Sequence, residues 1–201
     1  MTSGVKIAMP SIIIGLGNIG RKYRGTRHNL GFELLDFIAA QWNLKAVPGD
    51  GDYYMVGKEM EGKLIRLIWP TTYMNNSGKA AEQALQKFQL TPADLLVVYD
   101  DLNLPLGRLR IRSEGSDGGH NGMADIIYHL GTEKIARLRL GIGPLPTGCD
   151  AVSFVLNPFA DNELEMKKKT LDKAGEALLY LLKFDIAKAM SIYNPAPDEA
   201  Q

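Results

Sequence analysis

The chain has 201 residues, which is enough for one compact domain with a sizeable core and short for two. Its 23 Lys and Arg residues balance its 23 Asp and Glu residues, so the formal net charge is zero; this excludes a uniformly basic nucleic-acid-binding surface but not a local basic patch. A hydrophobic fraction of 45% and a charged fraction of 23% are typical of a globular protein and exclude gross disorder.

The first hundred residues alternate predicted strands with predicted helices. In chain order we expect a buried strand at 12–16, a helix from Leu30 capped by Asn29, strands at 53–60 and 63–69 joined by a turn at Glu61-Gly62, a helix from Ser77, and an apolar strand at 95–99. The last of these strands is expected to end at Asp100 and Asp101.

The second hundred residues continue the same alternation. We expect a half-buried strand with a basic face at 108–112, a Gly-rich loop at 115–119, a helix at 121–130, a strand at 135–142, helices through most of the C-terminal third, and a frayed tail at 194–201. The sequence therefore predicts a single α/β domain over residues 1–201, with its core at about 11–193 and a central mixed β-sheet flanked by helices.

The number of cysteines and the length of the apolar runs indicate the cellular compartment in which we expect the protein. Cys149 is the only cysteine, which excludes an internal disulfide and a cysteine-based zinc site and favours the reducing cytoplasm. The longest apolar runs, such as residues 12–14, are far too short for a membrane span, and we expect no signal peptide and no membrane contact.

Residues 15–20 match the G-x-G-x-x-G pattern of dinucleotide-binding sites. That site needs a helix to begin at its third glycine, because the pyrophosphate binds at the helix N-terminus. Here residues 21–27 show no helical periodicity and the helix is expected only from Leu30. The pattern therefore favours a tight loop that approaches a ligand over a nicotinamide or flavin site.

His28 and Asp100 are the strongest candidates for chemistry. His28 precedes a predicted helix, where the helix dipole favours the neutral imidazole that takes a proton from water. Asp100 follows a strand, where α/β proteins gather functional groups, and a carboxylate there would orient a histidine. Local packing of His28 and a turn-capping role for Asp100 are the alternatives, and Asp101 is the second choice for the acid.

Three asparagines lie at the ends of predicted elements: Asn18 follows the first strand, Asn75 precedes the helix from Ser77, and Asn121 opens the helix at 121–130. Each is a candidate for gripping a peptide backbone or polarising a carbonyl, although each also fits a turn or cap. His120 is expected to pack locally or to bind substrate, and His129 to lie on the surface. Cys149 lacks the local pattern of a hydrolase nucleophile. The spacing of the three histidines predicts no metal site.

Basic residues concentrate in the loop after the first strand and on two of the strands. Arg108 and Arg110 belong to the basic face predicted at 108–112, and Arg137 to the strand at 135–142. Solvated surface is the simplest interpretation. If these groups converge near the candidate site, they are possible contacts for the phosphates of a nucleic acid.

Four ordered segments together resemble the bacterial-type peptidyl-tRNA hydrolases. They are Gly-Leu-Gly-Asn-Ile-Gly at 15–20 with Thr-Arg-His-Asn at 26–29, Pro-Thr-Thr-Tyr-Met-Asn-Asn-Ser-Gly at 70–78, Tyr-Asp-Asp-Leu-Asn-Leu-Pro at 99–105, and Gly-Gly-His-Asn-Gly at 118–122 with Arg-Leu-Arg-Leu-Gly-Ile-Gly at 137–143. The resemblance runs from about Ile12 to Tyr193. It implies a monomeric cytoplasmic enzyme that cleaves the ester between a peptide and the terminal ribose of tRNA, without metal or organic cofactor.

The same resemblance assigns roles to individual residues. The implied catalytic set is His28 as general base, Asp100 as its orienting acid, and Asn18 as the group that helps to distinguish blocked from free aminoacyl-tRNA; the implied substrate-binding set is Tyr23, Tyr73, Asn75 and Asn121. The chain departs from the family pattern at Ile19, where proline is frequent, at Tyr73, where phenylalanine is common, and at Asp117, where histidine is frequent. The alternative function is that of a non-catalytic RNA-binding relative with the same fold.

Overall fold

The computed structural model describes residues 9–194, and within them seven strands form one sheet. The strands are β1 (Ile12–Gly15), β2 (Val47–Pro48), β3 (Tyr53–Met60), β4 (Lys63–Pro70), β5 (Leu95–Pro105), β6 (Leu109–Arg112) and β7 (Ala136–Gly143). They lie in the order β2-β3-β4-β1-β5-β7-β6. The four central strands are parallel, while β2, β3 and β6 pair antiparallel with their neighbours, so the predicted mixed sheet is confirmed.

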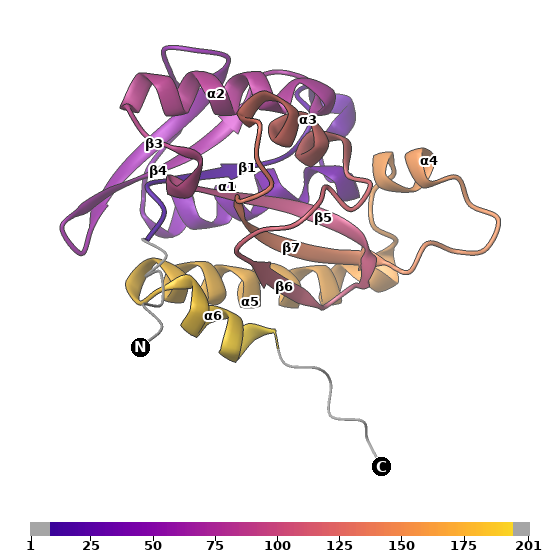
Figure 1. Ribbon diagram of the computed structural model, residues 1–201. Helices are drawn as coiled ribbons and strands as arrows, with labels where there is room; N and C mark the ends of the chain where they lie inside the picture. The colour runs from indigo at the N-terminus through magenta and orange to yellow at the C-terminus, as the bar shows by residue number, and fades with distance from the viewer. Residues whose placement is uncertain (1–8, 195–201) are drawn as a thin grey trace.

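Helices cover both faces of this sheet (Figure 1). They are α1 (Leu30–Gln41), α2 (Ser77–Phe88), α3 (Asn121–Leu130), α4 (Ala151–Leu156), α5 (Leu164–Lys183) and α6 (Ile186–Tyr193). The α1 and α5 helices pack together on one face, and α2 and α3 pack together on the other. The result is the single α/β domain that the sequence predicts. In the part of the chain that the structure describes, no helix is long and apolar enough to cross a membrane.

The local sequence explains why these elements form. Along β1, Ile13 faces the core under α1 and α5, whereas Ile12 and Ile14 face the core under α2 and α3. A strand buried on both faces is continuously apolar, as this one is. The predicted hairpin turn between β3 and β4 is also present, with φ of 50° at Glu61 and 72° at Gly62, the left-handed pair of a tight two-residue loop.

Three local predictions need correction. The β5 strand does not end at Asp100 but runs on to Pro105, because β7 pairs with it past Asp101. The side chain of Asn29 does not cap α1, since it bonds to the backbone of Asn18 instead. Asn194, the first residue of the predicted frayed tail, bonds through its side chain to both backbone groups of Ile111; residues 195–201 lie outside the described chain.

Candidate active site

The N-terminal end of α1 lies directly against the ends of β1 and β5. A β-carbon at Gly31 would lie 2.5 Å from the carbonyl oxygen of Val98 and 2.6 Å from the backbone nitrogen of Leu16, so the position requires glycine. This approach places the short 3-10 helix that precedes α1, Arg27–Asn29, against β5. The close backbone approach at Gly31 therefore brings His28 within reach of Asp100.

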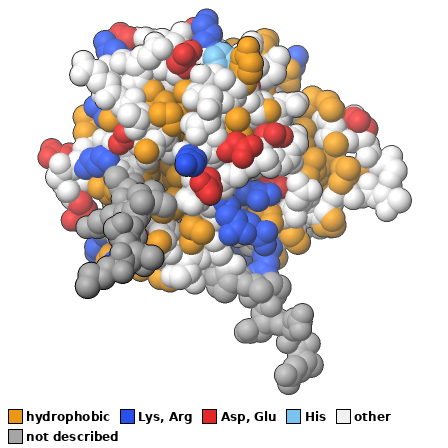
Figure 2. Space-filling model, viewed as in Figure 1, with side chains coloured by type: hydrophobic (Ala, Val, Ile, Leu, Met, Phe, Trp, Pro, Cys, Tyr) orange, Lys and Arg blue, Asp and Glu red, His pale blue; other side chains and the backbone are white. Residues whose placement is uncertain are grey.

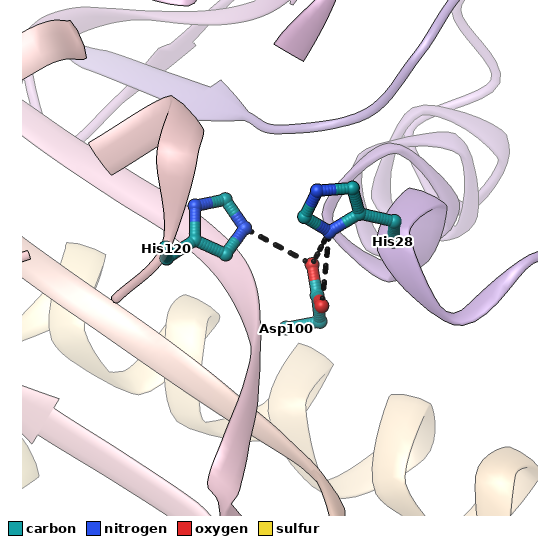
Figure 3. A group of neighbouring side chains, drawn as sticks. All are labelled: His28, Asp100 and His120. Atoms are coloured by element: carbon teal, nitrogen blue, oxygen red, sulfur yellow. Dashed lines mark hydrogen bonds and ion pairs between the residues drawn. The ribbon is translucent and has the colours of Figure 1, made fainter. Parts of the chain in front are cut away.

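Asp100 lies between two histidines that the sequence places far apart (Figure 3). The Nδ1 atom of His28 is 2.9 Å and 3.1 Å from the two carboxylate oxygens, and Nε2 of His120 is 3.2 Å from the nearer one. All three side chains are at least nine-tenths buried. The other nitrogen of the His28 ring points away from the acid, and His28 lines the pocket described below. The sequence did not predict that His120 bonds to Asp100.

Hydrogen bonds fix which ring nitrogen of each histidine carries the proton. The backbone N–H of Met123 donates to Nδ1 of His120, so Nε2 of that ring carries the hydrogen donated to Asp100. Nδ1 of His28 likewise donates to the carboxylate, which leaves Nε2 of His28 with a free lone pair. His28 is therefore arranged as a base.

The same hydrogen bonds bear on metal binding. The nearest ligand atoms of His28, Asp100 and His120 lie within 4.8 Å of one another, a spacing that a metal ion could bridge. A metal ligand must offer a lone pair, however, and Nε2 of His120 offers a proton because its other nitrogen accepts the Met123 N–H. The donor set does not fit a metal, and we read the cluster as a hydrogen-bonded network.

The charge of Asp100 follows from its neighbours. Burial would by itself raise the pKa of this carboxyl group, because a buried charge loses its hydration. The positive charge that His28 and His120 can carry, together with their hydrogen bonds, outweighs this cost and holds the pKa of Asp100 well below its usual range. Asp100 is thus an ionised acceptor that receives an N–H from each imidazole.

Asn18 is held in one orientation by its surroundings. The side chain of Asn29 pairs with both backbone groups of Asn18, at 2.8 Å and 3.0 Å. The side-chain oxygen of Asn18 accepts the backbone N–H of Met74 at 2.9 Å, which leaves its NH₂ group as the end available to donate. Asn18 is 93% buried, and Asn29, which holds its backbone, is the residue directly after His28. An amide fixed in this way can donate to a carbonyl or to water.

The predicted substrate-binding residues lie on three segments: the loop after β1, the segment after β4 and the start of α3. The rings of Tyr23 and Tyr73 meet edge to face with centroids 6.4 Å apart, and Tyr73 is 53% exposed. Asn75 follows Met74 in a short 3-10 helix that packs against α3, and Asn121 is the first residue of α3. Both asparagine side chains are exposed. Their roles stay predictions.

A pocket opens beside the His28–Asp100 pair. Its lining comes from the β5 strand, the Gly-rich loop and the start of α3, β7, and α4: His28, Tyr99, Asp100, Asp101, Leu102, Asp117, Gly118, Gly119, His120, Asn121, Arg139, Ala151, Val152 and Val155. Asp101, the second choice for the acid, pairs with Arg139 rather than with a histidine. The pocket therefore combines an apolar wall from α4 with a polar wall that contains His28.

Arg137 does not face the solvent, which corrects its prediction as a phosphate contact. It is 99% buried, and its guanidinium group donates to the carbonyl oxygens of Ile135, Ser116 and Glu133. All of these bonds lie within the protein and hold the Gly-rich loop on β7. The position of Arg137 on the predicted strand does not show that this loop covers its side chain.

We therefore expect Arg137 to affect stability rather than affinity for a nucleic acid. Arg137→Met should lower the free energy of unfolding by about 2–4 kcal/mol, because buried carbonyl groups lose their donors. Urea unfolding measures this effect. The salt dependence of nucleic-acid binding should stay as in the wild type, whereas Arg110→Gln should reduce its logarithmic slope by about 1. A flatter slope in Arg137→Met would restore the original prediction.

Arg108 and Arg110 remain candidates for phosphate contacts. Arg110 lies directly opposite Arg139 in the pairing of β6 with β7, and Arg139 lines the pocket. The apolar residues between the arginines of β6 are buried and the arginines are not, so the predicted basic face is confirmed. Figure 2 shows basic side chains gathered above the C-terminal end of the described chain, with acidic groups beside them.

The fold and the site define an α/β protein equipped for general-base catalysis. Residues 12–201 match the family model of peptidyl-tRNA hydrolase. Peptidyl-tRNA hydrolases of Synechocystis sp. and Thermotoga petrophila are 45% and 46% identical to the chain, over 92% and 91% of it and 96% of each relative. The peptidyl-tRNA hydrolase structure from Acinetobacter baumannii superposes with a TM-score of 0.86 at 31% identity, over 96% of this chain and all of that one. The chain therefore belongs to the peptidyl-tRNA hydrolase family, as its four motifs predict.

Proposed function

We propose that this protein hydrolyses the ester that joins a peptide, or an N-blocked amino acid, to the 3′-terminal ribose of tRNA. Family membership supports the reaction class, and one observation carries the mechanism: a buried carboxylate holds Nδ1 of His28 and leaves Nε2 free at a pocket. The reaction releases tRNA from peptides whose synthesis has stopped early.

Water is the nucleophile in this mechanism. Nε2 of His28 takes a proton from water as its oxygen bonds to the ester carbonyl carbon, and Asp100 stabilises the imidazolium that forms. The tetrahedral intermediate then expels the ribose oxygen, which takes the proton back from Nε2. The products are tRNA with a free hydroxyl group and the carboxylic acid of the peptide, which loses its proton to solvent and becomes the carboxylate. No metal or organic cofactor has a step in this sequence.

Amide groups supply the recognition of the substrate. The NH₂ group of Asn18, fixed by the bond from Met74, donates to the carbonyl region of the substrate, and Asn75 and Asn121 bind the peptide backbone. Backbone contacts are indifferent to side chains, so peptides of many sequences are accepted. Tyr23 and Tyr73 line the path of the 3′ end, and Arg108 and Arg110 contact tRNA phosphates.

The protein acts as a monomer in the cytoplasm, where its tRNA substrate is found. The alternative function, a non-catalytic RNA-binding relative, leaves the base, its acid and the pocket without a use. Purified protein should convert N-acetyl-aminoacyl-tRNA to free tRNA and N-acetyl-amino acid while leaving aminoacyl-tRNA intact. Binding of both tRNAs without release of N-acetyl-amino acid would overturn the proposal and favour the alternative.

A further inference from the structure

Arg27, the residue before His28, points to the segment that follows α4. Its guanidinium group donates to the carbonyl oxygens of Asn157 at 3.3 Å and Pro158 at 2.7 Å, and pairs with Glu163 at 2.6 Å. Its own backbone N–H also donates to the Asn157 carbonyl, at 3.1 Å. Arg27 is 94% buried. A buried cation with these partners ties the two segments together.

Two aromatic rings complete the surroundings of this guanidinium group. Its central carbon lies 4.1 Å from the ring centre of Phe154 and 5.0 Å from that of Phe159. Phe154 belongs to α4 itself, and Phe159 lies just after it. A planar guanidinium group can stack on such rings while it forks to two carbonyls, and an ammonium group cannot do both.

The segment that Arg27 holds forms one wall of the pocket. Ala151, Val152 and Val155 of α4 line the pocket together with His28. Residues 146–150, which lead into α4, are exposed. The loop between β7 and α4, to which they belong, extends away from the rest of the molecule (Figure 1). The distance of this wall from His28 therefore depends on how the C-terminal end of α4 is attached.

We propose that Arg27 is a positioning residue, which holds the α4 wall of the pocket at the distance from His28 that fits the substrate. This inference rests on the function proposed above. Arg27 touches neither Asp100 nor the pocket, and the His28–Asp100 bond is made by other atoms. Its loss therefore weakens the binding of substrate more than it slows the chemical step.

Steady-state kinetics with N-acetyl-aminoacyl-tRNA test this proposal. Arg27→Met should raise KM about tenfold and change kcat less than about twofold. Arg27→Lys keeps the charge and the pairing with Glu163 but not both carbonyl bonds, so KM should stay raised about threefold. If Arg27→Met does not fold, the KM of Arg27→Lys tests the proposal in its place. A fall in kcat at unchanged KM would show that Arg27 acts on the base and would overturn the proposal.

Lys167→Met is the matched control. Lys167 is also a largely buried cation, it lies 5.0 Å from the ring centre of Phe159, and it pairs with Glu33 at 2.6 Å. It makes no bond to residues 157 and 158, so its loss should lower thermal stability while leaving KM unchanged. An equal rise of KM in both variants would reduce the role of Arg27 to general stability and overturn the proposal.

Hydrogen exchange separates this proposal from the proposed function. The backbone amides of α4 should exchange about tenfold faster in Arg27→Met than in the wild type, and unchanged in Lys167→Met. If the amides of α4 keep their wild-type exchange in Arg27→Met, the anchoring proposal fails whatever the activity. If the wild type itself cleaves no ester, the proposed function fails while the exchange rates still decide the anchoring.

Discussion

Replacing His28 with alanine is expected to lower the rate of ester cleavage at least about 10³-fold, because general-base catalysis is lost. Binding of tRNA is expected to stay within about threefold of the wild type, since the phosphate contacts lie on other elements. The rate is measured in single turnovers of N-acetyl-aminoacyl-tRNA. Binding is measured with an analogue whose ester is replaced by an amide.

His129→Ala is the matched control for this variant. His129 lies near the end of α3, where its Nδ1 bonds to the backbone oxygen of Asp125 at 3.0 Å and its side chain is 26% exposed. Its replacement removes an imidazole without reaching the pocket, so turnover should stay at the wild-type level. Near-normal turnover in His28→Ala would show that another group activates the water.

The elements that the sequence predicts well are those set by local rules. The helix from Leu30, the helix over 121–130 and the hairpin at Glu61-Gly62 follow from periodicity and turn chemistry within a few residues, and the structure confirms all three. The pairing of His28 with Asp100 was expected as well. Their positions before a helix and after a strand made both residues candidates, with Asp101 as the second choice for the acid, and the resemblance to the family implied that Asp100 orients His28.

The predictions that failed depend on partners distant in the sequence. The end of β5 was placed at Asp100 because two adjacent acids suggest a turn, yet the alternation of Leu102, Asn103 and Leu104 continues and β7 supplies the pairing. The burial of Arg137 depends on a loop that covers it. The bond from His120 to Asp100 depends on how α3 begins. Spacing within one element does not determine such contacts.

The zero net charge acquires a structural explanation from the same contacts. Several basic groups near the pocket are neutralised within the protein, as in the pairs Arg27–Glu163 and Arg139–Asp101. Arg137 is buried under carbonyl groups. The cations that remain at the surface for phosphate include Arg110 of β6 and the exposed Arg21, Lys22 and Arg24 of the loop after β1. A small basic surface of this kind is consistent with release of tRNA after cleavage, because fewer phosphate contacts give weaker binding.

Replacing Asp100 with asparagine is expected to lower kcat by about 10²–10³-fold while changing substrate affinity less than about threefold. Asparagine keeps the shape of the side chain but lacks the charge that stabilises the imidazolium, and its NH₂ group opposes one histidine N–H. Asp101→Asn is the matched comparison, because Asp101 pairs with Arg139 and should cost kcat less than about threefold. A variant Asp100→Asn that binds poorly but turns over normally would assign Asp100 to substrate binding.

The pH dependence of the rate tests the same assignment independently. Because the pKa of Asp100 is held below its usual range, its carboxylate stays charged throughout the assay and does not itself shape the pH–rate profile. General-base catalysis predicts a rate that falls on acidification, as the base is protonated. In Asp100→Asn the imidazolium loses its neighbouring negative charge and forms less readily. In the plot of cleavage rate against pH, the fall on the acid side should therefore move to lower pH, while the maximal rate decreases. A fall on the acid side that stays in place would show that Asp100 does not act through His28, even if the maximal rate decreases as expected.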